Sequence, residues 1–243
     1  MSLKKDLYLV YGAHPLIELL KAKKRKLYSL YTTKEEPKLF KKVQPLLHPS
    51  CTVHHVTKDE LTRRAGSDDH QGLVGYATAP LEIRKKPFLP EIHPLLVMLD
   101  GIHDARNIGA IIRSAYCTGA DGIVITQKNS GPLNAAALKA SAGLAERATI
   151  YEKSTAAAAV HELKQAGYQI YLAALGGTSI NKVHFTLPAV IVIGNEGQGI
   201  SPEILQSGTR IMLPQRTADI SYNASVAAGI LLFTVAQQSG KLT

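Results

Sequence analysis

The sequence predicts an α/β protein whose larger part is built on a parallel sheet, and three observations support this prediction. Five apolar runs with little polar alternation lie within residues 94–243, as expected for strands buried on both faces. Helical patterns separate most of these runs, as in repeated strand–helix units. Two of the last runs end in polar loops, and ligands bind at such strand ends in open α/β sheets.

The elements of this larger part follow from periodicity and from breaks at glycine and proline. We expect strands at Leu95–Leu99, Gly122–Thr126, Gln169–Ala174, Ala189–Ile193 and Arg210–Leu213. We expect helices at about Ile108–Thr118, Leu133–Ser141, Thr155–Ala166 and Ala224–Gln237.

The first 79 residues predict a smaller α/β domain. Thr57 and Glu60 form a capping box, so a helix should begin after Thr57. Before it we expect strands at Leu7–Val10, Leu27–Tyr31 and Thr52–Val56, a helix from Ala13 and a second helix over Glu35–Leu47; a last strand follows at Leu73–Ala77. Three prolines and three basic residues in 80–93, followed by Pro94, indicate a linker, so the expected domains are 1–79 and 94–243.

Composition narrows the class of protein. A chain of 243 residues with 45% hydrophobic residues can bury a substantial core. No apolar run reaches the roughly 18 residues of a membrane span, no signal-peptide pattern opens the chain, and there are two cysteines. We therefore expect a cytoplasmic protein with no membrane partner. His48, Cys51 and His54 suggest zinc, but strand alternation puts Cys51 and His54 on opposite faces, so we expect no metal.

The net charge of +9 is unevenly placed. Residues 1–93 carry 17 Lys and Arg against 10 Asp and Glu, whereas residues 94–243 carry 11 against 9. Clustered cations suit a phosphate backbone, although a solvated helix face would have the same composition. The expected RNA contacts are Lys23, Lys24, Arg25, Lys26, Lys41 and Lys42.

Three junctions between strand and helix carry the polar residues of a candidate site. Asn107 and Arg113 follow the first strand of the larger domain, Glu196 lies within the glycine-rich loop of residues 194–199, and Ser221 and Asn223 precede the last helix. Each has a structural explanation: Asn107, Ser221 and Asn223 could be helix caps, and Arg113 and Glu196 could be surface residues. Their joint occurrence at successive junctions favours a ligand site.

The segments Asp100–Ala115, Ile191–Ser201 and Ile211–Phe233 resemble the three motifs of the SpoU/TrmH family of SPOUT RNA 2′-O-ribose methyltransferases. The matching residues are Asn107, Gly109, Arg113, Gly194, Glu196, Gly197, Gly199, Pro214, Ser221, Asn223, Ser225, Val226 and Ala227. The chain departs from the family pattern where Ala105 replaces a proline, Gln215-Arg216 replace a glycine, and Tyr222 and Ala224 replace leucine and valine.

Other segments extend the resemblance to nearly the whole chain. Tyr11–Pro15 and His70–Gly72 are similar to signatures of the family's substrate-binding domain, which has a ribosomal-protein-like RNA-binding fold. Lys139–Gly143 and Glu146 resemble a family segment between the first two motifs.

The resemblance implies a trefoil-knotted C-terminal methyltransferase domain, a homodimer, and methyl transfer from S-adenosyl-L-methionine to a ribose 2′-hydroxyl. The two-domain layout favours a guanosine in large-subunit (23S) ribosomal RNA. A transfer-RNA methyltransferase of the same family and a catalytically inactive RNA-binding protein are the alternatives.

The resemblance also assigns residues to roles. Those expected to bind cofactor are Leu175, Gly176, Gly194, Asn195, Glu196, Gly197, Leu213, Tyr222, Asn223 and Ala224. The expected catalytic residues are Asn107, Arg113, Glu196, Ser221 and Asn223. The family's proposed base is Arg113, but a guanidinium stays charged and offers no acceptor, so we favour a phosphate clamp that stabilises the developing alkoxide.

Overall fold

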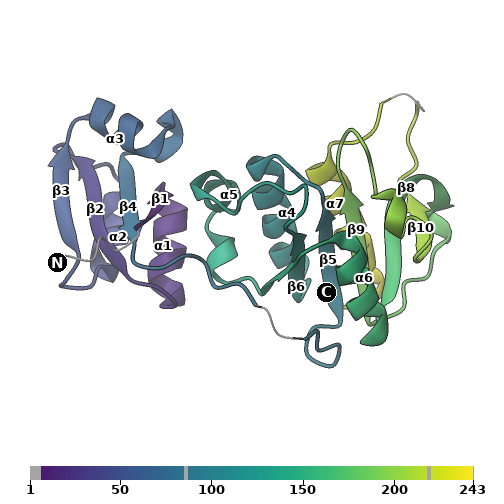
Figure 1. Cartoon of the computed structure of the whole chain (residues 1–243). Helices are drawn as coiled ribbons and strands as arrows, with labels where there is room; N and C mark the ends of the chain where they lie inside the picture. Colours follow the sequence, from purple (N-terminus) through teal and green to yellow (C-terminus); the bar gives the residue numbers. More distant parts are fainter. Residues whose placement is uncertain (1–6, 85–86, 218–219, 243) are drawn as a thin grey trace. The chain divides into compact units, whose positions relative to one another are not determined.

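The computed structural model describes residues 7–84, 87–217 and 220–242, which form two compact units (Figure 1). Unit 1 contains residues 1–82 and 133–147, and unit 2 contains residues 83–132 and 148–243. Residues 133–147, from the middle of the chain, are therefore grouped with the first 82 residues. The expected division into 1–79 and 94–243 had assigned them to the larger domain. No helix among the described residues is long and apolar enough to cross a membrane.

Unit 1 is built on a four-stranded mixed sheet with the strand order β1-β4-β2-β3. Strand β4 is antiparallel to β1 and β2, and β2 is parallel to β3. Its elements are β1 (Tyr8–Tyr11), α1 (Ala13–Ala22), β2 (Leu27–Thr33), α2 (Phe40–Val43), β3 (Thr52–Val56), α3 (Lys58–Ala65), β4 (Leu73–Ala77) and α5 (Ala135–Ala140).

Helices cover both faces of this sheet. Val74 packs with Leu61 of α3, whereas a side chain at the neighbouring Gly75 would meet Leu16 of α1 at 2.8 Å. Successive strand residues point to opposite faces, so α1 and α3 lie on opposite sides of β4. Thr57 begins α3, and its hydroxyl oxygen accepts the backbone N–H of Glu60 at 3.3 Å, which confirms the predicted cap.

Residues 133–147 are fastened to the rest of unit 1 by a buried ion pair. The Arg25 guanidinium contacts the Glu146 carboxylate, and the two side chains are 4% and 1% exposed. A further nitrogen of Arg25 donates to the carbonyl oxygen of Ala79 at 3.0 Å. Arg147, at the end of the segment, pairs with Glu18 of α1.

Unit 2 is built on a six-stranded parallel sheet with the order β10-β8-β9-β5-β6-β7, which confirms the predicted fold class. Its elements are β5 (Leu95–Asp100), α4 (Ala105–Cys117), β6 (Gly122–Thr126), β7 (Ile150–Lys153), α6 (Ala156–Gln165), β8 (Gln169–Ser179), β9 (Ala189–Gly194), β10 (Thr209–Met212) and α7 (Ala224–Gln238).

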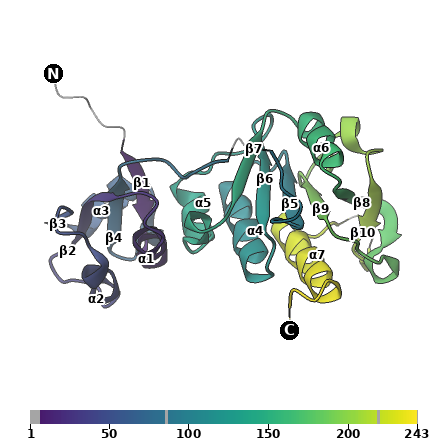
Figure 2. The same cartoon turned by 90° about the horizontal axis from the view of Figure 1, so that it is seen from below.

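The core of unit 2 lies on both faces of this sheet. Ala159, Val160 and Leu163 of α6 pack on one face, and all six residues of β5 are buried. Figure 2 shows α6 on one side of the sheet, with α4 and α7 on the other. The strand ends are thereby left at one edge, where the polar loops emerge.

Three elements differ from the prediction for identifiable reasons. Strand β7 was missed, because it is a four-residue edge strand that pairs with β6 and carries Glu152 and Lys153. The long helix expected over Glu35–Leu47 is reduced to α2 and a 3₁₀ turn, since Pro37 and Pro45 interrupt it. Strand β8 runs five residues beyond the predicted Ala174.

The stretch expected to be a linker is packed over much of its length. Leu81 and Phe88 are buried, and Arg84 donates its backbone N–H to Ile150 at 2.7 Å. Arg84 thus extends the sheet beside β7, in a parallel bridge to Tyr151. Lys85 and Lys86, which carry much of its charge, lie outside the described residues.

Candidate active site

A cavity of about 390 Å³ opens at the carboxyl ends of β9 and β10, beside residues 173–175 of β8. Its volume falls within the roughly 300–1,000 Å³ typical of small-molecule and cofactor sites. The loop of residues 194–199 forms one wall, and the segment that leads into α7 forms another. The sheet topology therefore places a ligand-sized space where the sequence predicted a crevice.

The loop of residues 194–199 is held in shape by its own backbone. Asn195 and Gly199 exchange backbone hydrogen bonds of 3.0 and 2.8 Å. A side chain at Gly194 would lie 2.3 Å from the carbonyl carbon of Gly199, so glycine is required there. The Asn195 side-chain oxygen accepts from Gly197 and Gln198, and its nitrogen donates to the carbonyl of Gly101 at 2.8 Å. The loop is thus preformed.

A buried carboxylate fixes the far end of the same loop. Asp100, the last residue of β5, is 3% exposed. Its two oxygens accept the backbone N–H of Ser201 at 2.7 Å and the Ser201 hydroxyl at 2.8 Å. These charge-assisted bonds tie residues after the loop to the centre of the sheet.

Three predicted residues meet beside the cavity. The Asn107 side-chain nitrogen donates to the Glu196 carboxylate, and the Asn107 oxygen accepts from the Asn223 side chain at 3.2 Å. Asn223 also begins α7, because its side-chain oxygen accepts the backbone N–H of Ser225 at 2.9 Å. Residues from three separate motifs therefore form one hydrogen-bonded chain.

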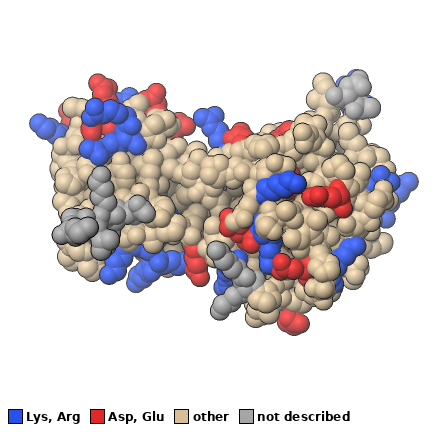
Figure 3. All heavy atoms as spheres, in the orientation of Figure 1, with Lys and Arg blue, Asp and Glu red and all other residues tan. Residues whose placement is uncertain are grey.

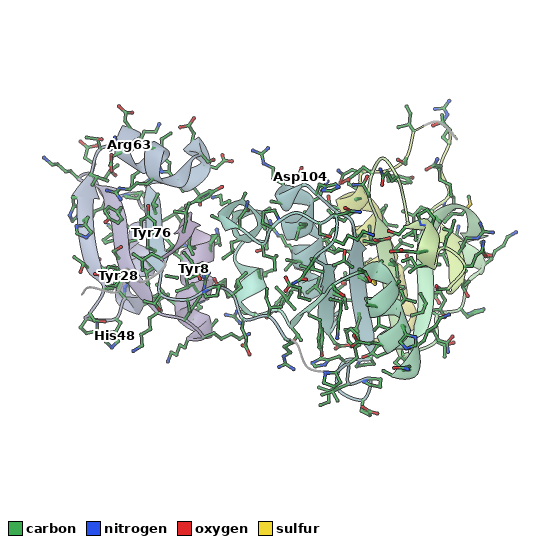
Figure 4. The ribbon with its side chains drawn as sticks, in the orientation of Figure 1. Tyr8, Tyr28, His48, Arg63, Tyr76 and Asp104 are labelled. Atoms are coloured by element: carbon green, nitrogen blue, oxygen red, sulfur yellow. The ribbon has the colours of Figure 1, made fainter. Side chains whose placement is uncertain are left out.

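Asn107 is free to join this chain because another residue caps α4. Asp104 is the N-cap, and its side chain accepts the backbone N–H of Arg106 at 2.8 Å. Figure 4 shows Asp104 at the start of α4. The alternative in which Asn107 is the cap is wrong. Asn107 lies in the first turn, and its amide group serves Glu196 and Asn223.

Arg113 is not part of this cluster. It is exposed on α4 and does not line the cavity. Six residues separate it from Asn107, which in an α-helix is about 9 Å along the axis and about 120° of rotation. Ser221 is exposed and does line the cavity.

The cavity wall contains most of the residues expected to bind cofactor. The lining residues that had been predicted are Leu175, Gly194, Asn195, Glu196, Gly197, Leu213, Tyr222 and Ala224. Gly176 and Asn223 do not line it. Sequence reasoning missed Arg210 and Leu205, among others, because no motif marks them, and it assigned Gln215 only as a departure from the family pattern.

The segment Leu175-Gly176-Gly177 is not the strand-end loop that was expected. It lies within β8, where the pairing with β10 jumps from Leu172↔Arg210 to Thr178↔Ile211. The intervening residues bulge from the ladder, and Leu175 is 62% exposed. A break in strand pairing of this kind leaves no clear mark in hydrophobic periodicity.

The basic residues of unit 1 differ in accessibility. Lys23, Lys24, Lys26, Lys41 and Lys42 are exposed, and Figure 3 shows Lys and Arg side chains gathered at the upper and lower margins of this unit. Arg25 is the exception, because its buried guanidinium is occupied by Glu146 and the Ala79 carbonyl. The structure contradicts the prediction that Arg25 contacts RNA.

Two protein families match this chain, one over its first part and one over the rest. The SpoU rRNA Methylase family matches residues 94–233, and the RNA 2′-O ribose methyltransferase substrate-binding family matches residues 9–82. An uncharacterized tRNA/rRNA methyltransferase of Mycolicibacterium gilvum is 33% identical over 242 residues, covering 96% of this chain and 77% of the relative.

Solved structures share the fold. The SpoU methyltransferase AviRb from Streptomyces viridochromogenes, in complex with AdoMet, has a TM-score of 0.81 at 20% identity, over 98% of this chain and 92% of its own. An AdoMet-bound rRNA methyltransferase from Sinorhizobium meliloti has a TM-score of 0.78 at 22% identity, over 98% and 88%.

The parallel sheet, the preformed glycine-rich loop and the cavity define an α/β protein with a small-molecule site at its strand ends. The family matches specify its class. This chain belongs to the SpoU rRNA methylase family and is an S-adenosylmethionine-dependent RNA 2′-O-ribose methyltransferase, as its motifs had indicated.

Proposed function

We propose that this enzyme methylates the ribose of a guanosine in large-subunit (23S) ribosomal RNA, in the cytoplasm, and that transfer RNA is the alternative substrate. The observation that supports ribosomal RNA is the match of both units to solved rRNA methyltransferases, which covers 98–99% of this chain. Two structures of enzymes that act on tRNA match 61–62% of it. We infer that unit 1 is the part that these two enzymes lack.

The cofactor would occupy the cavity beside residues 194–199. Backbone groups of this loop and of Leu213 would hold it, with Leu175 and Tyr222 as apolar walls. The sulfonium supplies an activated methyl group when bound. The chain's own task is to hold the ribose 2′-oxygen in line with that methyl group and to aid the loss of the hydroxyl proton.

Asn107, Glu196 and Asn223 would orient the ribose, since their shared hydrogen bonds fix each amide and carboxylate. Ser221, at the cavity wall, would contact ribose or cofactor. Arg113 would act as a charged clamp on a phosphate and on the developing alkoxide. The positive charge of Arg113 would stabilise the negative charge that develops on the ribose 2′-oxygen as the hydroxyl loses its proton.

Because Arg113 lies away from the cavity of its own chain, we place it in the site of a second copy. Apolar residues of α4 and α7 remain exposed: Tyr116 (41%), Val226 (49%), Ile230 (38%) and Phe233 (53%). The last three recur at helical spacing and form one stripe. A homodimer, built around the trefoil knot that the family resemblance implies, would cover this stripe and carry Arg113 to the partner's cavity.

Two experiments test these proposals. Ribose methylation would be mapped in cellular RNA with and without the gene, and loss of one guanosine mark in 23S RNA is expected. A lost mark in transfer RNA would support the alternative.

For the dimer, Arg113→Ala and Asn223→Ala proteins would be mixed after gentle dissociation. Recovered methyl transfer in the mixture would support a shared site, whereas continued inactivity would contradict it.

A further inference from the structure

Three segments of unit 1 that the methyl-transfer site does not use converge at one place. They are Tyr11–Pro15, His70–Gly72 and Lys139–Gly143. The backbone N–H of Ala13 donates to the Gln71 side-chain oxygen at 3.2 Å. A side-chain carbon at Gly12 would lie 2.6 Å from the Lys139 ammonium nitrogen and 3.2 Å from that Gln71 oxygen. The Lys139 and Gln71 side chains therefore meet over Gly12.

The backbone of these segments is shaped for this convergence. Gly12, Gln71 and Gly72 have φ angles of +90°, +56° and +75°. Glycine is favoured at position 12 by the φ of +90°, and a side chain there would have to displace the ends of the Lys139 and Gln71 side chains. Gln71 is a non-glycine residue in the left-handed region, where long side chains are uncommon. The side-chain oxygen of Gln71 accepts a hydrogen bond from the backbone N–H of Ala13, the first residue of α1.

The groups at this place are hydrogen-bond donors. The Gln71 oxygen is engaged by Ala13, so the exposed amide NH₂ remains as a donor. Lys139 is half-buried, and within the described ranges no carboxylate lies within 4.0 Å of its ammonium group. Burial lowers the pKa of Lys139, and the more distant Asp69 opposes that shift. The exposed His14 lies two residues after Gly12.

We propose that Lys139 and Gln71 form a binding site for a backbone phosphate of the substrate RNA. The proposal rests on the proposed function in that RNA is the ligand of unit 1. Phosphate oxygens accept hydrogen bonds and would complete a set of donors that lacks an acceptor. A partly desolvated ammonium group gains from a nearby anion. Unit 1 carries 16 Lys and Arg against 10 Asp and Glu, which favours RNA over an acidic protein.

This site needs both parts of unit 1. Lys139 comes from residues 133–147, and Gln71 comes from residues 1–82. The buried Arg25–Glu146 pair holds the first part against the second, and Gly143 lies against Pro15, where a side chain would come within 2.7 Å of its Cα. Residues 133–147 thus supply the cation of this site.

The test is a salt titration of RNA binding with full-length Lys139→Met and Lys139→Arg proteins, using large-subunit rRNA transcribed in vitro. Loss of one phosphate contact should reduce the slope of log K against log salt by about 0.7–0.9. Lys139→Met should bind about tenfold more weakly, near the lower limit for a hydrogen bond to a charged group. Lys139→Arg should retain most of the affinity.

Gln71→Glu gives an independent variant, because it keeps an oxygen for Ala13 but replaces the NH₂ donor with a carboxylate. It should also weaken RNA binding. Lys164→Met, which alters an exposed lysine of α6 in unit 2, is the matched control and should leave the slope unchanged. Melting temperature and S-adenosylmethionine binding should stay at wild-type values in all four proteins.

An unaltered slope and affinity in Lys139→Met, or equal weakening by Lys164→Met, would overturn the phosphate site. Failure of the wild-type protein to bind ribosomal RNA would instead refute the proposed substrate. The same titration would then be repeated with transfer RNA. Lys139→Met should reduce the slope of log K against log salt by the same amount if the phosphate site exists.

Discussion

Unit 1 and unit 2 each bury a charged group, and they use it differently. In unit 2, Asp100 lies at the end of a fully buried strand and accepts two hydrogen bonds from Ser201, which fixes the loop beside the cavity. In unit 1, Arg25 and Glu146 form an ion pair between distant parts of the sequence. One buried charge shapes a ligand site, and the other joins a segment to its unit.

The two units differ in how far apart in the sequence their key contacts lie. The cavity of unit 2 is assembled largely from the segments that follow β9 and β10, together with residues 173–175 of β8. Unit 1 is completed by residues 133–147, which lie more than 50 positions after its last strand. Disturbing the ion pair should therefore damage unit 1 and its RNA binding, whereas disturbing the loops should damage cofactor binding or turnover.

The largest expected effect is on the ion pair. Glu146→Ala leaves the Arg25 guanidinium buried without its carboxylate and should lower the free energy of unfolding by about 3–5 kcal/mol. Urea unfolding would measure this loss. The exposed Lys24–Glu82 pair, 3.9 Å apart, is the control, and Lys24→Ala should change stability by at most about 0.5 kcal/mol.

A double variant distinguishes charge from packing at the same place. Arg25→Met with Glu146→Leu removes both charges and should recover much of the stability lost in Glu146→Ala, since apolar replacement of a buried pair is often neutral. A double variant as unstable as the single one would show that the Ala79 contact or the shape of the site matters more than the unpaired charge.

The next effect concerns turnover in unit 2. Arg113→Ala should reduce methyl transfer about 100- to 1,000-fold, the usual cost of losing one group that stabilises developing charge. Cofactor affinity by calorimetry should stay near wild type, because Arg113 is proposed to contact the RNA phosphate and the developing alkoxide and not the cofactor. Comparable turnover in the variant would contradict the assignment.

Asn223 offers a contrast with Arg113, because it both caps α7 and contacts Asn107. Asn223→Ala should lower stability by about 0.5–2 kcal/mol through loss of the cap, and turnover as well. Asn223→Ser should keep the cap and lose the amide donor to Asn107. If Asn223→Ser is fully active, the hydrogen bond to Asn107 has no part in catalysis.

The sequence predicted unit 2 better than unit 1 for a physical reason. Asn107 and Glu196 follow the buried strands β5 and β9, and Asn223 follows the short strand β10, so their meeting at one edge could be expected from parallel topology. Arg25 looked like its lysine neighbours in composition, and its burial depends on Glu146, 121 positions away. The bulge around Leu175 depends on pairing with β10, which local patterns also do not reveal.

A smaller effect tests the exposed cations of unit 1. Lys23, Lys24 and Lys26 replaced together by Met should reduce the slope of log K against log salt for RNA by about 2–3, if each contacts one phosphate. Arg25 stays unchanged in this variant, because its loss would test stability instead. S-adenosylmethionine affinity should not change, and an unaltered salt slope would assign RNA binding to other residues.

The departure at Gln215 gives a smaller effect in unit 2. Gln215 lines the cavity, and its side-chain nitrogen donates to the Thr217 carbonyl at 2.7 Å. Gln215→Gly restores the family's residue type at this turn and should tighten S-adenosylmethionine binding about twofold, since such exposed changes are worth about 0.5 kcal/mol. Weaker binding would show that the Thr217 contact holds the cavity wall in place.

The smallest effect is a loss of stability in mild acid, with one histidine responsible in each unit. Burial lowers the pKa of His70 in unit 1 and of His93 in unit 2 below the ordinary 6.5, and Lys58 and Arg84 respectively add to the shift. Each unfolded histidine therefore binds a proton before the folded one does. The stability from these two groups is complete above about pH 6.5 and is lost as pH falls below it.

The contacts explain why the charged form is disfavoured. The His70 Nδ1 accepts the backbone N–H of Gly72 at 2.9 Å, a bond that a second ring proton would break. The His93 ring lies against the Tyr151 hydroxyl at 2.9 Å.

Hydrogen exchange between pH 8 and pH 5 would follow amides of β4 for unit 1 and of β5 for unit 2. His70→Gln should flatten the acid dependence of β4, and His93→Gln that of β5. Equal flattening of both strands by either variant would show that the two units unfold as one.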